Sequence, residues 1–299
     1  MTILVTGATG RPGSAVIREF VRHGQPVRAL VRTREKAQAI EGLPSVAVTY
    51  GDMLRPETLG AALDGVDRVL MISSAGPQML ETQCTFIDAA RSAGVRHLVK
   101  LSGEDSTVGF DPERFRSTRS HEQIQRYLLG SGLAWTLLRP SQFMQAYHEE
   151  APTIAAEGEL RLPLGHARLA PVDVEDIAKV AYRVLRDEGH EGQTYRMTGP
   201  EALSMAEIAE RISRAIGRPV RYVDVPPEEK RRAWLADGYP PERADAFLQL
   251  FAERRRRHES RVDLSTHETF GVPPTTFADF ARRTSAAFRG ESAYTATPA

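Results

Sequence analysis

The sequence predicts an α/β fold with a doubly wound parallel sheet, and two observations lead to this prediction. The chain opens with a short apolar run, turns through three spaced glycines and continues into an amphipathic segment. Strand-like and helix-like segments then alternate as far as Pro140, a pattern typical of parallel strands joined by crossover helices. Beyond Pro140 the loops lengthen and proline pairs appear, which predicts a smaller, mixed α+β region.

The individual elements follow from apolar periodicity. Ile3, Leu4 and Val5 suit a strand that is buried on both faces, and residues 14–23 carry apolar side chains at helical spacing. Further strands are expected at 27–31, 46–50, 68–72, 97–101 and 135–138. Helices are expected at 34–40, 56–63, 79–93 and 117–129, and after Pro140 at about 174–187, 205–216, 228–236, 242–257 and 277–288.

The three glycines of the first turn indicate a nucleotide cofactor. Gly7, Gly10 and Gly13 lie between the first strand and the first helix. A pyrophosphate needs backbone N–H groups that it can approach without a Cβ in the way, and the helix N-terminus adds the positive end of its dipole. The spacing is GxxGxxG and not the commoner GxGxxG, but its position between strand and helix supports a Rossmann-type dinucleotide cradle.

The end of the second strand indicates which dinucleotide the cradle binds. A carboxylate at this place would bond the ribose hydroxyls of NAD, whereas this chain has Arg32 there, followed by Lys36. A guanidinium binds a 2′-phosphate through paired charge-assisted hydrogen bonds, so Arg32 favours NADP(H), with Arg11 or Lys36 as helpers. The alternative is an ordinary basic turn in solvent.

The other expected cofactor contacts follow strand ends, where such sheets bind their ligands. Asp52 lies near the adenine amine or simply caps the next helix, and the small residues after the fourth strand let the cofactor pass or form a plain turn. The complete expected set is Gly7, Thr9, Gly10, Arg11, Pro12, Gly13, Arg32, Lys36, Asp52, Met53, Ser73, Ser74, Gln78 and Pro140.

Over its first ~200 residues the chain resembles the NmrA-like branch of the atypical short-chain dehydrogenase/reductase superfamily, and bacterial NADPH:quinone reductases most of all. The motifs that carry the resemblance are Gly7-Ala-Thr-Gly-Arg-Pro-Gly13, Ala29-Leu-Val-Arg32, Gly51-Asp52, Ser131-Gly-Leu133, Thr136-Leu-Leu-Arg-Pro140 and Gly192-Gln-Thr-Tyr195. The resemblance implies a Rossmann fold, an NADP-type cofactor and a small C-terminal substrate domain. We expect the cofactor domain at 1–150, completed by about 171–197, an interleaved substrate domain at 151–290, and a frayed tail at 291–299.

The reacting end departs from the superfamily. Typical members carry a Tyr-x-x-x-Lys pair on a helix, whereas the corresponding helix here has His121 and Gln125 one turn apart on the same face. A quinone needs only a weak acid after hydride addition, so His121 and Ser102 are the candidate catalytic residues, although His121 also fits a surface histidine without a role. Phe143, Met144 and Tyr147 fit an apolar substrate wall or plain packing between domains.

Composition excludes several other classes of protein. Lys plus Arg and Asp plus Glu both number 39, so net charge gives no reason to expect nucleic acid, and the run ending at Arg257-His258 fits a solvated helix end. No apolar stretch approaches a membrane span, and the N-terminus shows no signal segment, which predicts a cytoplasmic protein. The one cysteine, Cys84, excludes an internal disulfide and a cysteine-rich metal site, and no metal is expected.

The function expected from these observations is that of an NADPH-dependent oxidoreductase, which passes hydride to a small aromatic or quinone-like acceptor. Two alternatives remain. The missing Tyr-x-x-x-Lys pair suits a non-catalytic NADP(H)-sensing regulatory protein, and no motif argues against a biosynthetic reductase, dehydratase or epimerase that acts on a polyketide-like substrate. The expected partner is a small-molecule substrate, and the protein is expected to be a monomer or a homodimer.

Overall fold

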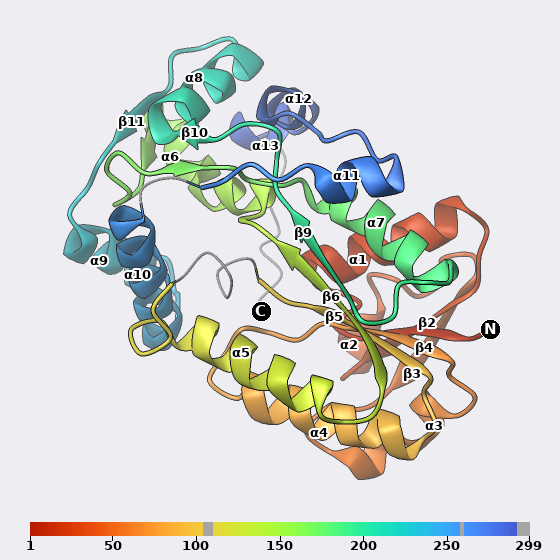
Figure 1. Cartoon of the computed structure of the whole chain (residues 1–299). Helices are drawn as coiled ribbons and strands as arrows, with labels where there is room; N and C mark the ends of the chain where they lie inside the picture. The colour runs from red at the N-terminus through yellow and green to blue at the C-terminus, as the bar shows by residue number, and fades with distance from the viewer. Residues whose placement is uncertain (104–109, 258–259, 292–299) are drawn as a thin grey trace.

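The computed structural model describes residues 1–103, 110–257 and 260–291 (Figure 1). Residues 292–299 of the expected frayed tail, and His258, lie outside this part. The chain forms a central sheet with helices on both faces and a second group of helices and short strands beside the carboxyl ends of the sheet strands (Figure 1). None of the described helices is both long and apolar enough to cross a membrane.

The central sheet has seven strands in the order β3-β2-β1-β4-β5-β6-β9, and every neighbouring pair is parallel. The strands are β1 (Ile3–Val5), β2 (Val27–Val31), β3 (Val46–Tyr50), β4 (Arg68–Met71), β5 (His97–Leu101), β6 (Ala134–Pro140) and β9 (Gln193–Met197). The order reverses between β1 and β4, as in a doubly wound sheet, so the predicted fold class is confirmed. β9 adds a seventh strand to the six located from the sequence.

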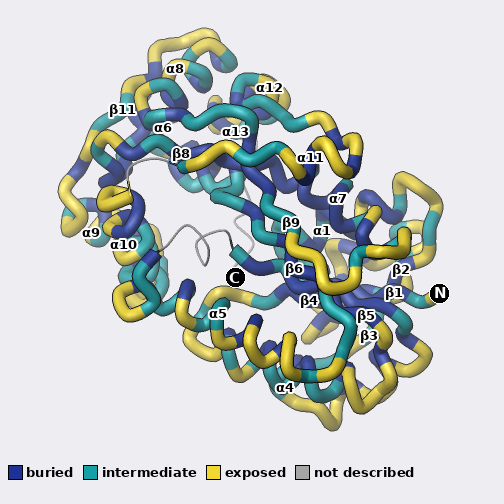
Figure 2. Tube along the Cα trace, viewed as in Figure 1, coloured by how far each residue is buried: buried dark blue, intermediate teal, exposed yellow. Residues whose placement is uncertain are grey.

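Helices cover both faces of the sheet and bury its apolar side chains. α1 (Arg11–Arg22) and α7 (Val174–Arg186) pack against each other on one face, and α4 (Met79–Ser92) and α5 (Arg116–Leu129) do so on the other. The two layers enclose separate apolar cores, one with Phe20 and one with Phe86 at its centre. The buried parts of the trace in Figure 2 accordingly run along the central strands. α11 (Ser265–Phe270) contacts β9 and α7.

The second lobe, as we call the remaining elements after Phe143, has an apolar core of its own. Its helical elements are η3 (Met144–Glu150), α6 (Ala151–Glu157), α8 (Met205–Ile216), α9 (Pro227–Ala236), α10 (Pro241–Arg256), α12 (Phe277–Arg283) and α13 (Ser285–Phe288). Its strands form two short pairs, β7 (Glu159–Arg161) with β11 (Arg221–Val223) and β8 (Arg168–Leu169) with β10 (Leu203–Ser204). The chain therefore leaves the sheet after β6, returns for α7 and β9, and leaves it again.

Three expected helices differ from the structure. α2 covers only Arg34–Ala37, because the chain then turns through Gly42, whose φ is +85°, to enter β3. The segment 56–63 consists of a 3-10 turn, η1 (Pro56–Thr58), and α3 (Gly60–Leu63). The segment expected at 277–288 is divided at Thr284, whose backbone is not helical.

Candidate active site

The glycine turn between β1 and α1 is packed so closely that side chains cannot be added to it. A Cβ on Gly13 would lie 2.1 Å from the carbonyl oxygen of Gly7, and a Cβ on Gly7, whose φ is +56°, would lie 2.9 Å from that of Ile72. Thr6, which is fully buried, fixes the turn to the end of β4 through hydrogen bonds with the N–H and C=O of Ile72. Gly10 begins α1 without a side-chain cap. A bare helix N-terminus behind a turn that a Cβ would fill fits the pyrophosphate of a dinucleotide.

Arg11, expected to help bind phosphate, connects the turn to the second lobe. Its Nη2 lies 2.7 Å from Oε1 of Glu149 in η3, and both side chains are mostly buried. Arg243 of α10 lies 3.5 Å from the same carboxylate oxygen, and Tyr239 donates a hydrogen bond of 3.3 Å to the other one. The turn and the second lobe are therefore joined through one carboxylate.

The basic residues after β2 lie close together. Arg32 is exposed and Lys36 is half-buried. Partial burial and, after it, the charge of Arg32 lower the pKa of Lys36. Thr33 begins α2 by accepting a hydrogen bond from the N–H of Lys36, which fixes the backbone of the turn between the two cations. The pair concentrates positive charge at the carboxyl end of β2.

The remaining expected cofactor contacts take up different places. The carboxylate of Asp52 accepts a hydrogen bond from the N–H of Leu54, so it caps its own turn, and Met53 is buried in the core under α3 and α4. Ser73 accepts a hydrogen bond of 2.8 Å from Gln83. The others on this edge are exposed Ser74 and Gln78, half-buried Thr9 and Pro12, and buried Pro140.

A polar cluster lies at the carboxyl ends of β5 and β6, against α5. Ser102 Oγ and Lys100 Nζ lie 3.4 Å and 3.1 Å from Nδ1 of His121. Gln125 donates a hydrogen bond of 2.8 Å to Ser102, and Arg139 of β6 donates to the side-chain oxygen of Gln125. The structure thus brings together Ser102, the His121 to Gln125 pair and Arg139 of the Thr136 to Pro140 motif, and it adds Lys100.

Lys100 is the residue of this cluster that sequence reasoning missed. It lies in β5, a central strand with the sequence His-Leu-Val-Lys-Leu, and its side chain is fully buried. Burial and, after it, the charge of Arg139 lower the pKa of Lys100 to about 7. The signal that could have revealed it is a lysine inside a strand expected to be buried, because a lysine is seldom buried there without a specific partner.

His121 is half-buried, and the positive charges around it keep its ring neutral. Burial, followed by the charges of Lys100 and Arg139, lowers its pKa well below the usual value. Its Nδ1 contacts Lys100 and Ser102, whereas its Nε2 has no hydrogen-bond partner within residues 1–103, 110–257 and 260–291. The ring can therefore present a neutral N–H to a ligand.

The three residues expected to form an apolar substrate wall differ in how far they are buried. Met144 and Tyr147 are each 1% exposed in the core of the second lobe, where the Tyr147 hydroxyl faces the sulfur of Met205. Phe143 is half-buried and packs against the edge of the first core. Of the three, only Phe143 keeps surface that a substrate can contact.

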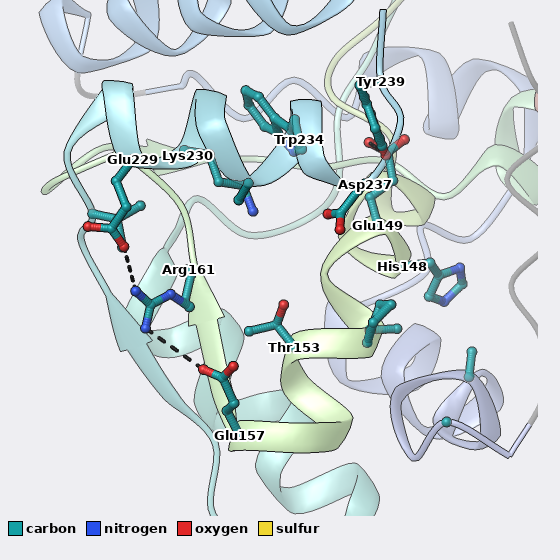
Figure 3. Close-up of a pocket in the computed structure, with 16 residues that line it drawn as sticks. His148, Glu149, Thr153, Glu157, Arg161, Glu229, Lys230, Trp234, Asp237 and Tyr239 are labelled. Carbon is teal, nitrogen blue, oxygen red and sulfur yellow. Dashed lines mark hydrogen bonds and ion pairs between the residues drawn. The ribbon is translucent and has the colours of Figure 1, made fainter.

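The second lobe also contains a cavity of about 960 Å³ between α6, α9 and α13 (Figure 3). Arg161 points between Glu157 and Glu229, at 3.8 and 2.5 Å, and Lys230 lies 2.7 Å from both carboxylate oxygens of buried Glu150. These charged side chains pair with acidic groups of the same lobe. The cavity shares no lining residue with the Lys100 and His121 cluster.

Comparison with known proteins agrees with the fold. The sequence matches the NmrA-like family over residues 1–281, which is almost the whole chain. The chain belongs to the NmrA-like family. This NmrA-like protein is 38% identical over 287 residues to the NAD(P)H azoreductase of Xenophilus azovorans, and the match covers 96% of this chain and 99% of that protein.

Two further relatives are informative about this NmrA-like protein. A (4-alkanoyl-5-oxo-2,5-dihydrofuran-3-yl)methyl phosphate reductase of Streptomyces griseus subsp. griseus is 37% identical, with 97% of this chain and 100% of that protein covered. The crystal structure of an NADPH-dependent quinone oxidoreductase of Escherichia coli, complexed with NADPH, superposes with a TM-score of 0.83. It is 27% identical, and the match covers 94% of this chain and 99% of that one.

Proposed function

We propose that this NmrA-like protein is an NADPH-dependent oxidoreductase that transfers hydride to a small aromatic or quinone-like acceptor. The observation that carries the proposal is that the glycine turn and the Lys100 and His121 cluster both lie at the carboxyl ends of the same parallel sheet. Ligands of doubly wound sheets bind at this edge. The names of the azoreductase and quinone oxidoreductase relatives support the same class of reaction.

The cofactor contacts in this proposal come from the glycine turn and from the basic pair. Gly7, Gly10 and Gly13 let the pyrophosphate approach the backbone at the start of α1, and Arg32 with Lys36 binds the 2′-phosphate. Bound NADPH would supply the hydride.

The protein's own groups at the reacting end supply a proton and an apolar contact. His121 presents its Nε2 to the acceptor. Ser102, which accepts a hydrogen bond from Gln125, contacts Nδ1 and orients the ring. Phe143 is only partly buried, so its ring can contact a flat acceptor. A developing oxyanion or nitrogen anion needs one proton, which a neutral imidazole N–H can donate.

The test is stopped-flow loss of NADPH absorbance with a panel of quinones and azo dyes. We expect turnover with at least one acceptor and a strong preference for NADPH over NADH. Tight binding of NADPH without turnover of any acceptor would contradict the proposal and would support a cofactor-sensing regulator. In that case, pull-down with reduced and oxidised cofactor should recover a partner to different extents, because a ligand shifts only an equilibrium whose states it distinguishes.

A second candidate function is a biosynthetic reductase, and the relative from Streptomyces griseus favours it because it is 37% identical over 97% of this chain and 100% of that protein. An unsaturated lactone of the kind named for that relative is also reduced by hydride and one proton, so the same residues would serve. The two candidates are separated by adding such a lactone to the acceptor panel and comparing kcat/KM.

A further inference from the structure

The hydrogen bonds around His121 all run in one direction. Arg139 is a donor only, so it gives a hydrogen bond to the side-chain oxygen of Gln125, and the amide nitrogen of Gln125 gives one to Ser102 Oγ. The Ser102 hydroxyl, which has accepted from Gln125, can turn its hydrogen toward His121 Nδ1 at 3.4 Å. Lys100 is the nearer donor to the same nitrogen, at 3.1 Å, and the two contacts share its one lone pair.

These donors leave the imidazole only one role at Nδ1. A lysine ammonium has three donors and no acceptor, so Nδ1 beside it must carry a lone pair. The single hydrogen of the neutral ring is then on Nε2, which has no hydrogen-bond partner in the described part of the chain. While Lys100 is charged, which means below about pH 7, the network therefore selects one tautomer in advance of any substrate.

Lys100 is in addition the nearest proton source to that ring. It is fully buried, so it has no direct contact with solvent, and it has no carboxylate partner within the described residues. The groups that face it are Arg139 from β6, Cys84 from α4 and His121 from α5. A buried ammonium beside a second cation gives up its proton easily.

We infer that Lys100 is a positioning residue that fixes His121 as the Nε2–H tautomer and replaces the proton that His121 gives to the reduced acceptor. The inference rests on the proposed function. After the acceptor has received a hydride from the nicotinamide, it lacks one proton. The Nε2–H bond of His121 breaks and an O–H or N–H bond forms on the acceptor. At the same time Nδ1 takes a proton from Lys100 Nζ, so the ring stays neutral and Lys100 becomes an amine.

The relay requires Lys100 to be protonated, which gives the reaction a pH dependence with a definite sign. Because burial and Arg139 lower the pKa of Lys100 to about 7, the charged form is lost as the pH rises through that value. We expect kcat to be highest below pH 7 and to fall above it. Solvent restores the resting state by protonating Nε2 while Nδ1 returns its proton to Lys100.

Two variants separate a relay from a structural role. Lys100→Met keeps the unbranched shape but removes the proton, and we expect kcat to fall about 100-fold without the loss above pH 7. Lys100→Arg keeps charge and donors but cannot release a proton near neutral pH, so kcat should fall comparably although the tautomer is retained. Melting temperature and NADPH affinity are measured for both. A Lys100→Met profile with the wild-type fall above pH 7, or full activity in Lys100→Arg, would overturn the relay.

A measurement on the resting wild-type protein needs neither variant nor turnover. Nitrogen-15 NMR of the histidine rings, with the His121 signals assigned by their absence in His121→Gln, reports which nitrogen carries hydrogen. At a pH below 7, where Lys100 is charged, we expect hydrogen on Nε2 in the wild type and a mixture of tautomers in Lys100→Met. A wild-type His121 with hydrogen on Nδ1 would overturn the inference alone. If NMR shows the expected tautomer but the protein reduces no acceptor, the proposed function and the relay are refuted, whereas the positioning role of Lys100 is supported.

Discussion

The packing of the glycine turn allows a quantitative prediction for Gly13→Ala. The added Cβ would lie 2.1 Å from the carbonyl oxygen of Gly7 and 3.0 Å from the Cα of Ala8. Contacts under 3.0 Å essentially do not occur, so α1 and the turn must separate by about 0.9 Å. Both groups are backbone, and neither can rotate away as a flexible side chain would.

The energetic cost of this displacement should lie at the upper end of the range for overpacked sites, at about 3 kcal/mol. For a chain of this size each kcal/mol lowers the melting temperature by roughly 2–4 °C, so we expect a decrease of roughly 6–12 °C. The first turn of α1 moves with the glycine, and NADPH affinity should fall as well because the backbone N–H groups there are displaced. Differential scanning fluorimetry and fluorescence titration with NADPH measure the two effects.

Gly60→Ala is the matched control. Gly60 is exposed at the start of α3, its φ is not positive, and an added Cβ meets nothing within 4 Å. The same substitution there should raise stability by about 0.5–1 kcal/mol, through lower entropy of the unfolded chain, and should leave NADPH affinity unchanged. If Gly13→Ala melts like the wild type and binds NADPH equally well, close packing of this turn does not form the cofactor site.

Three further predictions concern charge. Arg32→Asp should weaken NADPH binding by 10-fold or more, roughly 1.4 kcal/mol, while NADH binding changes little; equal losses for both cofactors would show that Arg32 does not contact the 2′-phosphate. Burial lowers the pKa of His97 to about 4, so the unfolded chain binds a proton first as the pH falls below about 6.5, and stability should be lost between there and pH 4. In urea unfolding, His97→Gln should make the free energy of unfolding depend less steeply on pH in this range. An unchanged pH dependence would show that other groups cause the loss of stability. Lys230→Met should cost about 3–5 kcal/mol because it leaves Glu150 buried and unpaired, and adding Glu150→Gln should recover most of it; a double variant no more stable than Lys230→Met would argue against the pair.

The sheet could be predicted because its strands are short apolar runs that alternate with amphipathic helices. This pattern placed β2 and β3 at their observed bounds. The second lobe was harder, because its strands have only two or three residues and pair with segments far away in sequence, as Tyr222 does with Leu160. No local pattern specifies such a pair. The split at Thr284 could not be predicted either, because the residues on both sides of it have helical spacing.

The candidate site shows the same division. The helical spacing of His121 and Gln125 places them on one face, whereas the contact of His121 with Lys100 depends on how α5 packs on β5. Met144 and Tyr147 illustrate the opposite case. Apolar side chains at that spacing suit a pocket wall and a core equally well, and only the packing of η3 into the second lobe distinguishes them.

The departure from the Tyr-x-x-x-Lys pair can now be understood in terms of distance. In that pair the lysine lies one helical turn after the tyrosine and acts on it from the same helix. Here Gln125 occupies the lysine position, while a lysine from the neighbouring strand lies 3.1 Å from His121. An acid and a buried cation are thus brought together by the packing of α5 on β5, and not by spacing within one helix. The proposed chemistry requires only the distance, so in this proposal a sequence that lacks the pair still brings an acid next to a proton source.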